Sequence, residues 1–150
     1  MPISRRHLIL LPAALFGLPG AAEAATRRLN HHRGVALRGY DTVAWFAEGG
    51  PRRGSARHLA SWGGTTWHFD SAENLARFVA EPEAFAPRFG GFCAFGVARG
   101  YKVDIDPEAW HIHVGRLYLN YDRGVQRQWQ QDIAGHIATA EANWPRLMDS

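Results

Sequence analysis

Residues 110–121 read Trp110-His111-Ile112-His113-Val114-Gly115-Arg116-Leu117-Tyr118-Leu119-Asn120-Tyr121, and their alternating apolar and polar side chains predict a β-hairpin. Gly115 and Arg116 lie between the two alternating runs. A glycine at the first position of a two-residue loop is typical of a type II′ turn, so we place the turn at these residues. In that register Val114 lies opposite Leu117 and His111 lies opposite Asn120.

The two faces of this hairpin differ because successive side chains of a strand point to opposite sides. One face is apolar and is expected to lie in the core: Trp110, Ile112, Val114, Leu117, Leu119 and Tyr121. The other face carries His111, His113, Tyr118 and Asn120. The hairpin therefore contributes to the core on one side and presents polar groups on the other.

A second hairpin is predicted upstream, because Gly63-Gly64 separates two strand-like runs and is a strong turn signal. Asp70 or Ser71 then caps a helix. The buried face of that helix is marked by apolar residues at helical spacing: Leu75, Phe78 and Val79.

The segment 89–96 is rich in glycine and aromatic residues, which predicts close backbone packing and no helix. Residues 125–144 are expected to be helical in two pieces that break near Ala134-Gly135, with a stop at Trp144-Pro145. Together these elements predict an α+β fold: a small antiparallel sheet of hairpins with a short central helix and C-terminal helices.

The first residues predict an export signal spanning 1–24. Arg5-Arg6 precedes a short apolar run, and small residues favour cleavage after Ala24. The arginine pair favours the twin-arginine route, and an ordinary secretory leader is the alternative. The mature chain is then expected to be periplasmic or secreted, with an N-terminal arm over 25–38 and one domain over 39–147.

The composition narrows the class of protein. A hydrophobic fraction of 46% supports a real core, and one cysteine allows no disulfide within the chain. The net charge of +3 is small and evenly scattered, which predicts no nucleic-acid partner and no anionic membrane partner. No second long apolar stretch follows the leader, so no membrane insertion is expected after its removal.

Several motifs follow one another along residues 39–147: Gly39-Tyr40-Asp41-x-Val43-Ala44-x-Phe46, Trp67-x-Phe69-x-Ser71-Ala72-Glu73-Asn74, Ala86-Pro87-x-Phe89-Gly90-Gly91-Phe92-Cys93-Ala94 and Leu117-Tyr118-Leu119-Asn120-Tyr121. In this order they resemble the YHS-domain family, specifically its exported single-domain members. The likeness covers nearly all of the chain beyond the leader.

The resemblance implies a small α+β domain whose relatives accompany copper-exporting ATPases and some oxygenase subunits. It therefore implies a metal-transport or oxygenase partner, and a heavy-metal role for the wider family. Relatives with a soft-metal site carry two cysteines at a strand-to-helix junction, and these fall here at Asp70 and Asn74. Thiolate ligation at that junction is absent, and both residues are expected to cap the helix instead.

Cys93 is the first candidate metal ligand outside that junction. A free thiol could bind a soft ion such as Cu(I), or react as a nucleophile. The alternative, which we favour, is a small buried hydrophobe among neighbouring aromatic residues, because free cysteine is among the most buried residue types.

His111 and His113 are the second candidate. Two residues apart on one strand, their imidazoles project from the same face and could chelate Zn(II) or Cu(II). The third ligand would come from Tyr118, His68, His58 or the His31-His32 pair. The alternative is a solvated strand face without metal.

No motif for catalysis or phosphate binding is found, so a non-catalytic protein is expected. Three functions remain open: an exported YHS-type domain that binds a transition metal such as copper or zinc, a metal-free module that binds a protein or small ligand through aromatic residues near 89–95, and a thiol enzyme using Cys93. The third is the least favoured.

Overall fold

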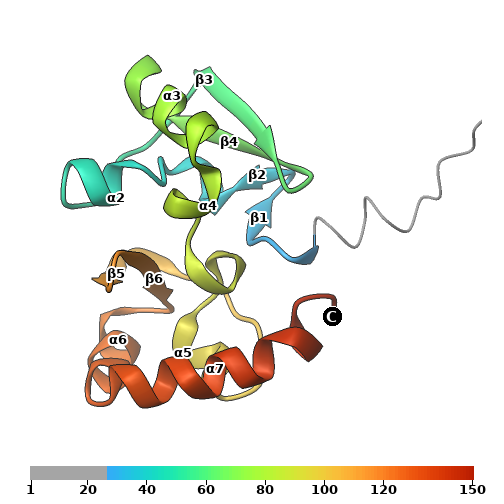
Figure 1. Ribbon diagram of the computed structural model, residues 1–150, viewed down its shortest axis with the longest axis vertical. Coiled ribbons are helices and arrows are strands. Elements are labelled where there is room, and N and C mark those ends of the chain that lie inside the picture. The colour runs from blue at the N-terminus through green and yellow to red at the C-terminus, as the bar shows by residue number, and fades with distance from the viewer. Residues whose placement is uncertain (1–26) are drawn as a thin grey trace, which may run out of the picture.

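The computed structural model describes residues 27–150, which form the expected α+β fold (Figure 1). Four strands make one sheet in the order β1-β2-β4-β3, and two more make a separate hairpin. The strands are β1 (His31–His32), β2 (Val35–Ala36), β3 (Ser55–Trp62), β4 (Thr65–Phe69), β5 (Asp106–His113) and β6 (Arg116–Asn120). The predicted signal residues Arg5, Arg6 and Ala24 lie outside the described residues.

Short helices connect these strands and longer ones end the chain. They are the α-helices α2 (Ala44–Ala47), α3 (Ala72–Ala80), α4 (Pro82–Phe85), α5 (Ala94–Ala98), α6 (Arg123–Gln130) and α7 (Ile133–Leu147), with the 3₁₀ turns η1 (Leu37–Gly39) and η2 (Arg88–Gly91). No helix formed by residues 27–150 combines the length and apolarity needed to cross a membrane.

The elements are stacked along the long axis of the molecule. Figure 1 shows the four-stranded sheet with α2, α3 and α4 in the upper half, the hairpin of β5 and β6 below it, and α5, α6 and α7 at the bottom. Two buried clusters follow this arrangement. The upper cluster includes Leu117 and Leu119 of β6, and the lower one includes Tyr118 of the same strand. The hairpin therefore lies between two cores.

The upstream hairpin is confirmed. Gly63 and Gly64 join β3 to β4, and their φ values of 61° and 75° are those of a type I′ turn. Trp67 and Phe69 of β4 are fully buried, and the ring of Phe78 lies 5.1 Å and 5.0 Å from theirs. These aromatic contacts hold α3 against the sheet.

The downstream hairpin also forms, but its predicted turn is wrong by one residue. His113 pairs with Arg116, so the turn consists of Val114 and Gly115, with φ values of 49° and 70°. Ile112 consequently lies opposite Leu117. Positive φ at both turn positions makes a type I′ turn in place of the predicted type II′ turn, and the twist of either type matches that of the flanking strands.

Most residues of this hairpin lie on the predicted face although the pairing register differs from the predicted one. Opposing positions move by two residues, and because side chains alternate with period two, the same four apolar side chains still share a face: Trp110, Ile112, Leu117 and Leu119. Val114 and Tyr121 are corrections, since they are 87% and 51% exposed. Val114 leaves the core because it lies in the turn itself.

The central helix begins as predicted. The Ser71 side chain accepts a hydrogen bond from the Asn74 N–H, which makes Ser71 the N-cap of α3. Asp70 is therefore not the cap. Phe78 is buried as predicted, but Val79 is 62% exposed because it lies on the outer side of the helix.

The glycine-rich segment contains both a confirmation and an error. A Cβ atom on Gly90 would lie 1.9 Å from the Arg28 carbonyl oxygen, which confirms close backbone packing. However, the chain is helical again from Ala94, because the Cys93 side chain caps α5 and accepts the Gly96 N–H. The prediction of no helix is wrong for this last part.

The C-terminal helices break earlier and end later than predicted. The Asp132 side chain accepts the Gly135 N–H and is the N-cap of α7, which begins at Ile133. The break between the two helices therefore precedes Ala134. Pro145 lies inside α7, which continues to Leu147. A proline so close to a helix end removes one hydrogen bond without stopping the last turn.

Residues 27–38 are part of the fold, which corrects the expected arm. Val35 pairs in parallel with Thr66 of β4, so the sheet is mixed and not antiparallel throughout. Leu29, Ala36 and Leu37 are buried in the upper core. The Asn30 N–H donates to the Gly90 carbonyl at 2.7 Å, so this segment also contacts the middle of the chain.

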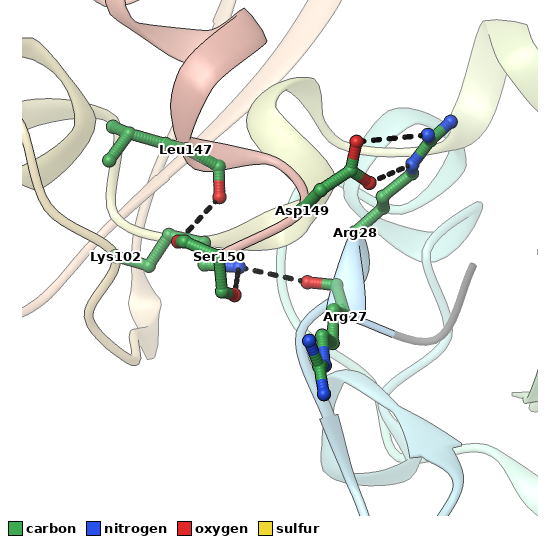
Figure 2. Close-up of polar contacts among 6 residues, drawn as sticks. All are labelled: Arg27, Arg28, Lys102, Leu147, Asp149 and Ser150. Atoms are coloured by element: carbon green, nitrogen blue, oxygen red, sulfur yellow. Dashed lines mark hydrogen bonds and ion pairs between the residues drawn. The ribbon is translucent and has the colours of Figure 1, made fainter. Parts of the chain in front are cut away.

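The C-terminus is attached to the same segment (Figure 2). Arg28 and Asp149 form a two-point ion pair, with Nε 2.5 Å from Oδ1. The Lys102 ammonium donates to the carbonyl oxygens of Arg27 and Ser150 at 3.1 Å and 2.7 Å. These contacts connect the first described residues, next to the four-stranded sheet, with the end of the chain after α7.

Candidate functional site

The pocket with the chemistry most suited to a ligand lies in the lower half, beside Cys93. Its volume is about 490 Å³, within the range of small-molecule sites. It is formed by α5, the loop that follows it, the end of β6 and one side of α6. The lining residues are Cys93, Phe95, Gly96, Arg99, Tyr101, Val103, Tyr121, Val125 and Gln128.

Cys93 contributes a fully satisfied thiol to this pocket. The sulfur accepts the N–H groups of Gly96 and Tyr121 at 3.4 Å and 3.3 Å. The thiol donates to Oδ1 of Asn120 at 3.5 Å. The side chain is 1% exposed. Cys93 therefore connects α5 to the end of β6, which is a structural role.

Burial raises the pKa of the Cys93 thiol, and the N–H groups of Gly96, Tyr121 and Phe95 offset only part of that effect. The thiol consequently stays protonated at neutral pH. A protonated, buried thiol is a poor nucleophile. The geometry thus gives no support to a thiol enzyme.

Asn120 is a residue whose importance sequence reasoning missed. It is completely buried, and its Oδ1 also accepts the Phe95 N–H at 3.2 Å. Its Nδ2 has no hydrogen-bond partner within residues 27–150. The signal in the sequence was its place on the polar face of the hairpin, but only the packing of α5 against β6 shows why a polar residue is buried there.

Aromatic side chains form the walls of the pocket. Tyr101 and Tyr121 are each about half exposed, at 50% and 51%. The guanidinium of Arg99 lies over the Phe95 ring, 5.4 Å from its centroid. The pocket therefore offers ring faces for stacking, with Arg99 and Gln128 available for hydrogen bonds to a ligand.

His111 and His113 lie side by side as predicted. Their ring centroids are 6.4 Å apart and the rings are inclined by 28°. His111 also packs edge-on against Trp129 at 5.6 Å, and Gln130 Nε2 lies 3.4 Å from its Nδ1. Burial and the charge of His113 lower the pKa of His111. Both imidazoles could contribute to a two-ligand metal site.

Cys93 is not part of that pair. Its backbone forms a bridge with Leu119 of β6, and β5, which carries His111, pairs with β6 by way of Tyr118. The inferred order places β6 between them, so two strand spacings of about 5 Å each separate their backbones. Across residues 27–150, no three His, Cys, Asp or Glu side chains gather in a group that could hold a metal ion.

Among the proposed third ligands, Tyr118 lies opposite His111 in the hairpin register, whereas the histidine candidates belong to a different sheet. Tyr118 is buried between Phe89 and Trp129, with centroid distances of 6.1 Å and 5.4 Å. The remaining candidates belong to the upper sheet, where His68 lies on β4, His58 on β3 and His31-His32 in β1.

The strand-to-helix junction does not fit a soft metal either. Asn74 donates its Nδ2 hydrogen to the buried carboxylate of Asp41 at 2.8 Å. Asp70 is exposed, and its N–H donates to the same carboxylate at 2.8 Å. An amide used as a donor and a carboxylate oxygen are unlike the thiolates that Cu(I) prefers. Asp41 joins the two sides of this junction through these hydrogen bonds.

Comparison with known proteins gives no relative: no protein-family model, no curated protein and no solved structure matches this chain. Family membership therefore stays a prediction from the motifs.

Proposed function

We propose that this chain is an exported, non-catalytic domain of the YHS type that binds a small aromatic compound in the pocket beside Cys93. The observation that carries this proposal is the pocket itself. Its walls are rings and aliphatic side chains, and its one thiol is already satisfied by protein groups. Such a site favours a ligand with a flat apolar body.

The polar groups of the pocket narrow the ligand class. Arg99 supplies a permanently charged fork, and Gln128 supplies an amide. We therefore expect the aromatic ligand to carry an acidic or hydrogen-bond-accepting group. Placement outside the cytoplasm rests on the leader motif, and the YHS assignment rests on the ordered motifs.

A fluorescence titration with 1-anilinonaphthalene-8-sulfonate, followed by an NMR screen of aromatic carboxylic acids, tests this proposal. Tyr101→Ala and Tyr121→Ala each remove one wall and should weaken binding roughly fivefold. Leu59→Ala, an equally exposed apolar residue on β3, serves as the matched control and should leave binding unchanged. Failure of the unmodified protein to bind any of these probes would overturn the proposal.

Metal handling is a second candidate function, supported by the neighbouring rings of His111 and His113. If it is correct, elemental mass spectrometry of the natively exported protein, purified without a His tag, finds about one copper or zinc ion per chain. His111→Ala/His113→Ala then loses the metal, whereas Cys93→Ala retains it because the thiol lies outside the pair. Absence of metal, with no binding of added Cu(I), Cu(II) or Zn(II), would eliminate this candidate.

A further inference from the structure

The charges of this protein are divided between its two halves, which corrects the expectation of an even scatter. Residues 27–69, which form the four-stranded sheet and α2, contain seven arginines but only two acidic residues, Asp41 and Glu48. Residues 70–150 contain eight lysines and arginines against eleven acidic residues. Asp41 is fully buried, and Glu48 is paired with Arg52. The sheet half therefore carries a net positive charge, although Arg28 and Arg38 are paired with Asp149 and Asp104 of the other half.

A cavity of about 540 Å³ lies within this basic half, at the end of the sheet where β1, β2 and β4 meet η1. Its lining consists of His32, Arg33, Val35, Arg38, Gly39 and His68. Two arginines and two histidines thus border one cavity, and no acidic side chain is among its lining residues. Figure 1 shows these strands in the half of the molecule opposite α5 and α6, so the cavity is distinct from the Cys93 pocket.

The backbone around the cavity is held in an uncommon conformation. Arg33 and Arg38 have φ values of 52° and 55°, and Gly39 follows at 85°. Left-handed backbone is unfavourable for arginine and persists only where the surrounding structure imposes it. His68 lies beside Gly39, because a Cβ atom there would be in ordinary van der Waals contact with the His68 Nδ1 at 3.4 Å. The two turns therefore bring both arginines to the same cavity.

The two arginines differ in what holds them. Arg38 forms an ion pair with Asp104, which also accepts hydrogen bonds from the Asn30 amide and the Ile105 N–H. Arg33 is exposed, and within the described part of the chain its guanidinium has neither an ion pair nor a hydrogen bond. One arginine is thus anchored and the other is available for a ligand.

We propose that this cavity binds a small anion that carries two or more phosphate or carboxylate groups. Arginine guanidinium groups donate paired hydrogen bonds that match the oxygens of either group. The rings of His32 and His68, which also line the cavity, add further N–H donors. The cavity is larger than a single phosphate needs, which favours an anion with more than one charged group.

Isothermal titration calorimetry of the purified protein tests the proposal with pyrophosphate and citrate as anions and glucose as an uncharged compound. In 50 mM NaCl, one or both anions should bind and glucose should not. Arg33→Asn, which suits the left-handed backbone, should weaken anion binding roughly tenfold because one charge-assisted contact is lost. Arg38→Gln should also weaken it, which gives a second variant on a different turn.

Arg127→Gln is the matched control, because it removes the same charge from the exposed side of α6 in the other half of the molecule. Its anion affinity should stay within about twofold of the unmodified protein, since exposed charges far from the site are screened. The proposal is overturned if neither anion binds, or if Arg127→Gln weakens binding as much as Arg33→Asn. The second outcome would mean diffuse attraction and no site.

Discussion

The thiol of Cys93 lies 3.5 Å from Oδ1 of Asn120, and this pair joins two segments that are 27 residues apart in the sequence. Asn120 Oδ1 also accepts the Phe95 N–H, while the sulfur accepts the Gly96 and Tyr121 N–H groups. The start of α5 and the end of β6 are consequently held together by side chains. Cys93 is also one of the residues that line the proposed ligand pocket.

Replacing either member of this pair should destabilise the domain. Cys93→Ala removes the cap of α5 and should lower the free energy of unfolding by about 1–3 kcal/mol, as should Asn120→Ala. Each single substitution leaves the remaining member of the pair without its hydrogen-bond partner. The loss of unfolding free energy in the double variant should therefore be smaller than the sum of the two single losses. Urea unfolding of the four proteins measures this coupling, and strict additivity would contradict a direct contact.

Cys93 should react slowly with thiol reagents. Burial raises its pKa, so little thiolate exists at pH 7–8 and the sulfur is also inaccessible. Labelling by 5,5′-dithiobis(2-nitrobenzoic acid) should be many times slower in the folded protein than in urea. Fast labelling of the folded protein would revive the thiol-enzyme hypothesis. The raised pKa also means that stability should fall as pH rises above about 8.5, because the unfolded thiol ionises first.

His111 should make the protein less stable in mild acid. Its pKa is lowered in the folded state, so as pH falls below about 6.5 the unfolded chain takes up a proton that the folded chain resists. The free energy of unfolding should therefore decrease between pH 7 and pH 5. His111→Gln should reduce this slope, whereas His32→Gln on the exposed β1 should not. Equal slopes in all three proteins would argue against a lowered pKa for the half-buried His111.

Gly90→Ala should be far more disruptive than Gly49→Ala. Both glycines have positive φ, 62° and 70°, so both substitutions add a similar backbone strain. A Cβ on Gly90 meets the Arg28 carbonyl oxygen at 1.9 Å, whereas nothing lies within 4 Å of one on Gly49. We expect a loss of about 1 kcal/mol for Gly49→Ala and more than about 3 kcal/mol for Gly90→Ala. Thermal unfolding would contradict the close approach if the two losses were equal.

Val114→Asn should stabilise the protein. Val114 has a φ of 49° and is 87% exposed, so a β-branched residue occupies a left-handed turn position without any packing in return. Asparagine followed by glycine is the preferred pair for a type I′ turn. The midpoint of urea unfolding should rise by an amount equivalent to about 1 kcal/mol, with no change in slope. Val79→Asn, on the exposed side of α3, is a control that should not stabilise.

Local patterns explain most of what could be predicted. The two hairpins, the Ser71 cap and the helices α3, α6 and α7 depend on side chains a few residues apart, so alternation, helical spacing and turn glycines are enough to find them. The error at Val114 has the same local origin. A glycine at position 115 fits either position of a two-residue turn. The observed register, which pairs Ile112 with Leu117, depends on packing that residue spacing does not reveal.

The sequence alone determined the class of the fold and the order of its two main hairpins, its central helix and its C-terminal helices, because these follow from short-range periodicity. Tertiary structure decided what each candidate side chain does. It buried Cys93 against Asn120, separated that thiol from His111 by a strand, and inserted residues 27–38 into the sheet. It also brought Arg33 and Arg38 to one cavity. Each of these outcomes depends on contacts between distant parts of the chain, and residue spacing carries no information about such contacts.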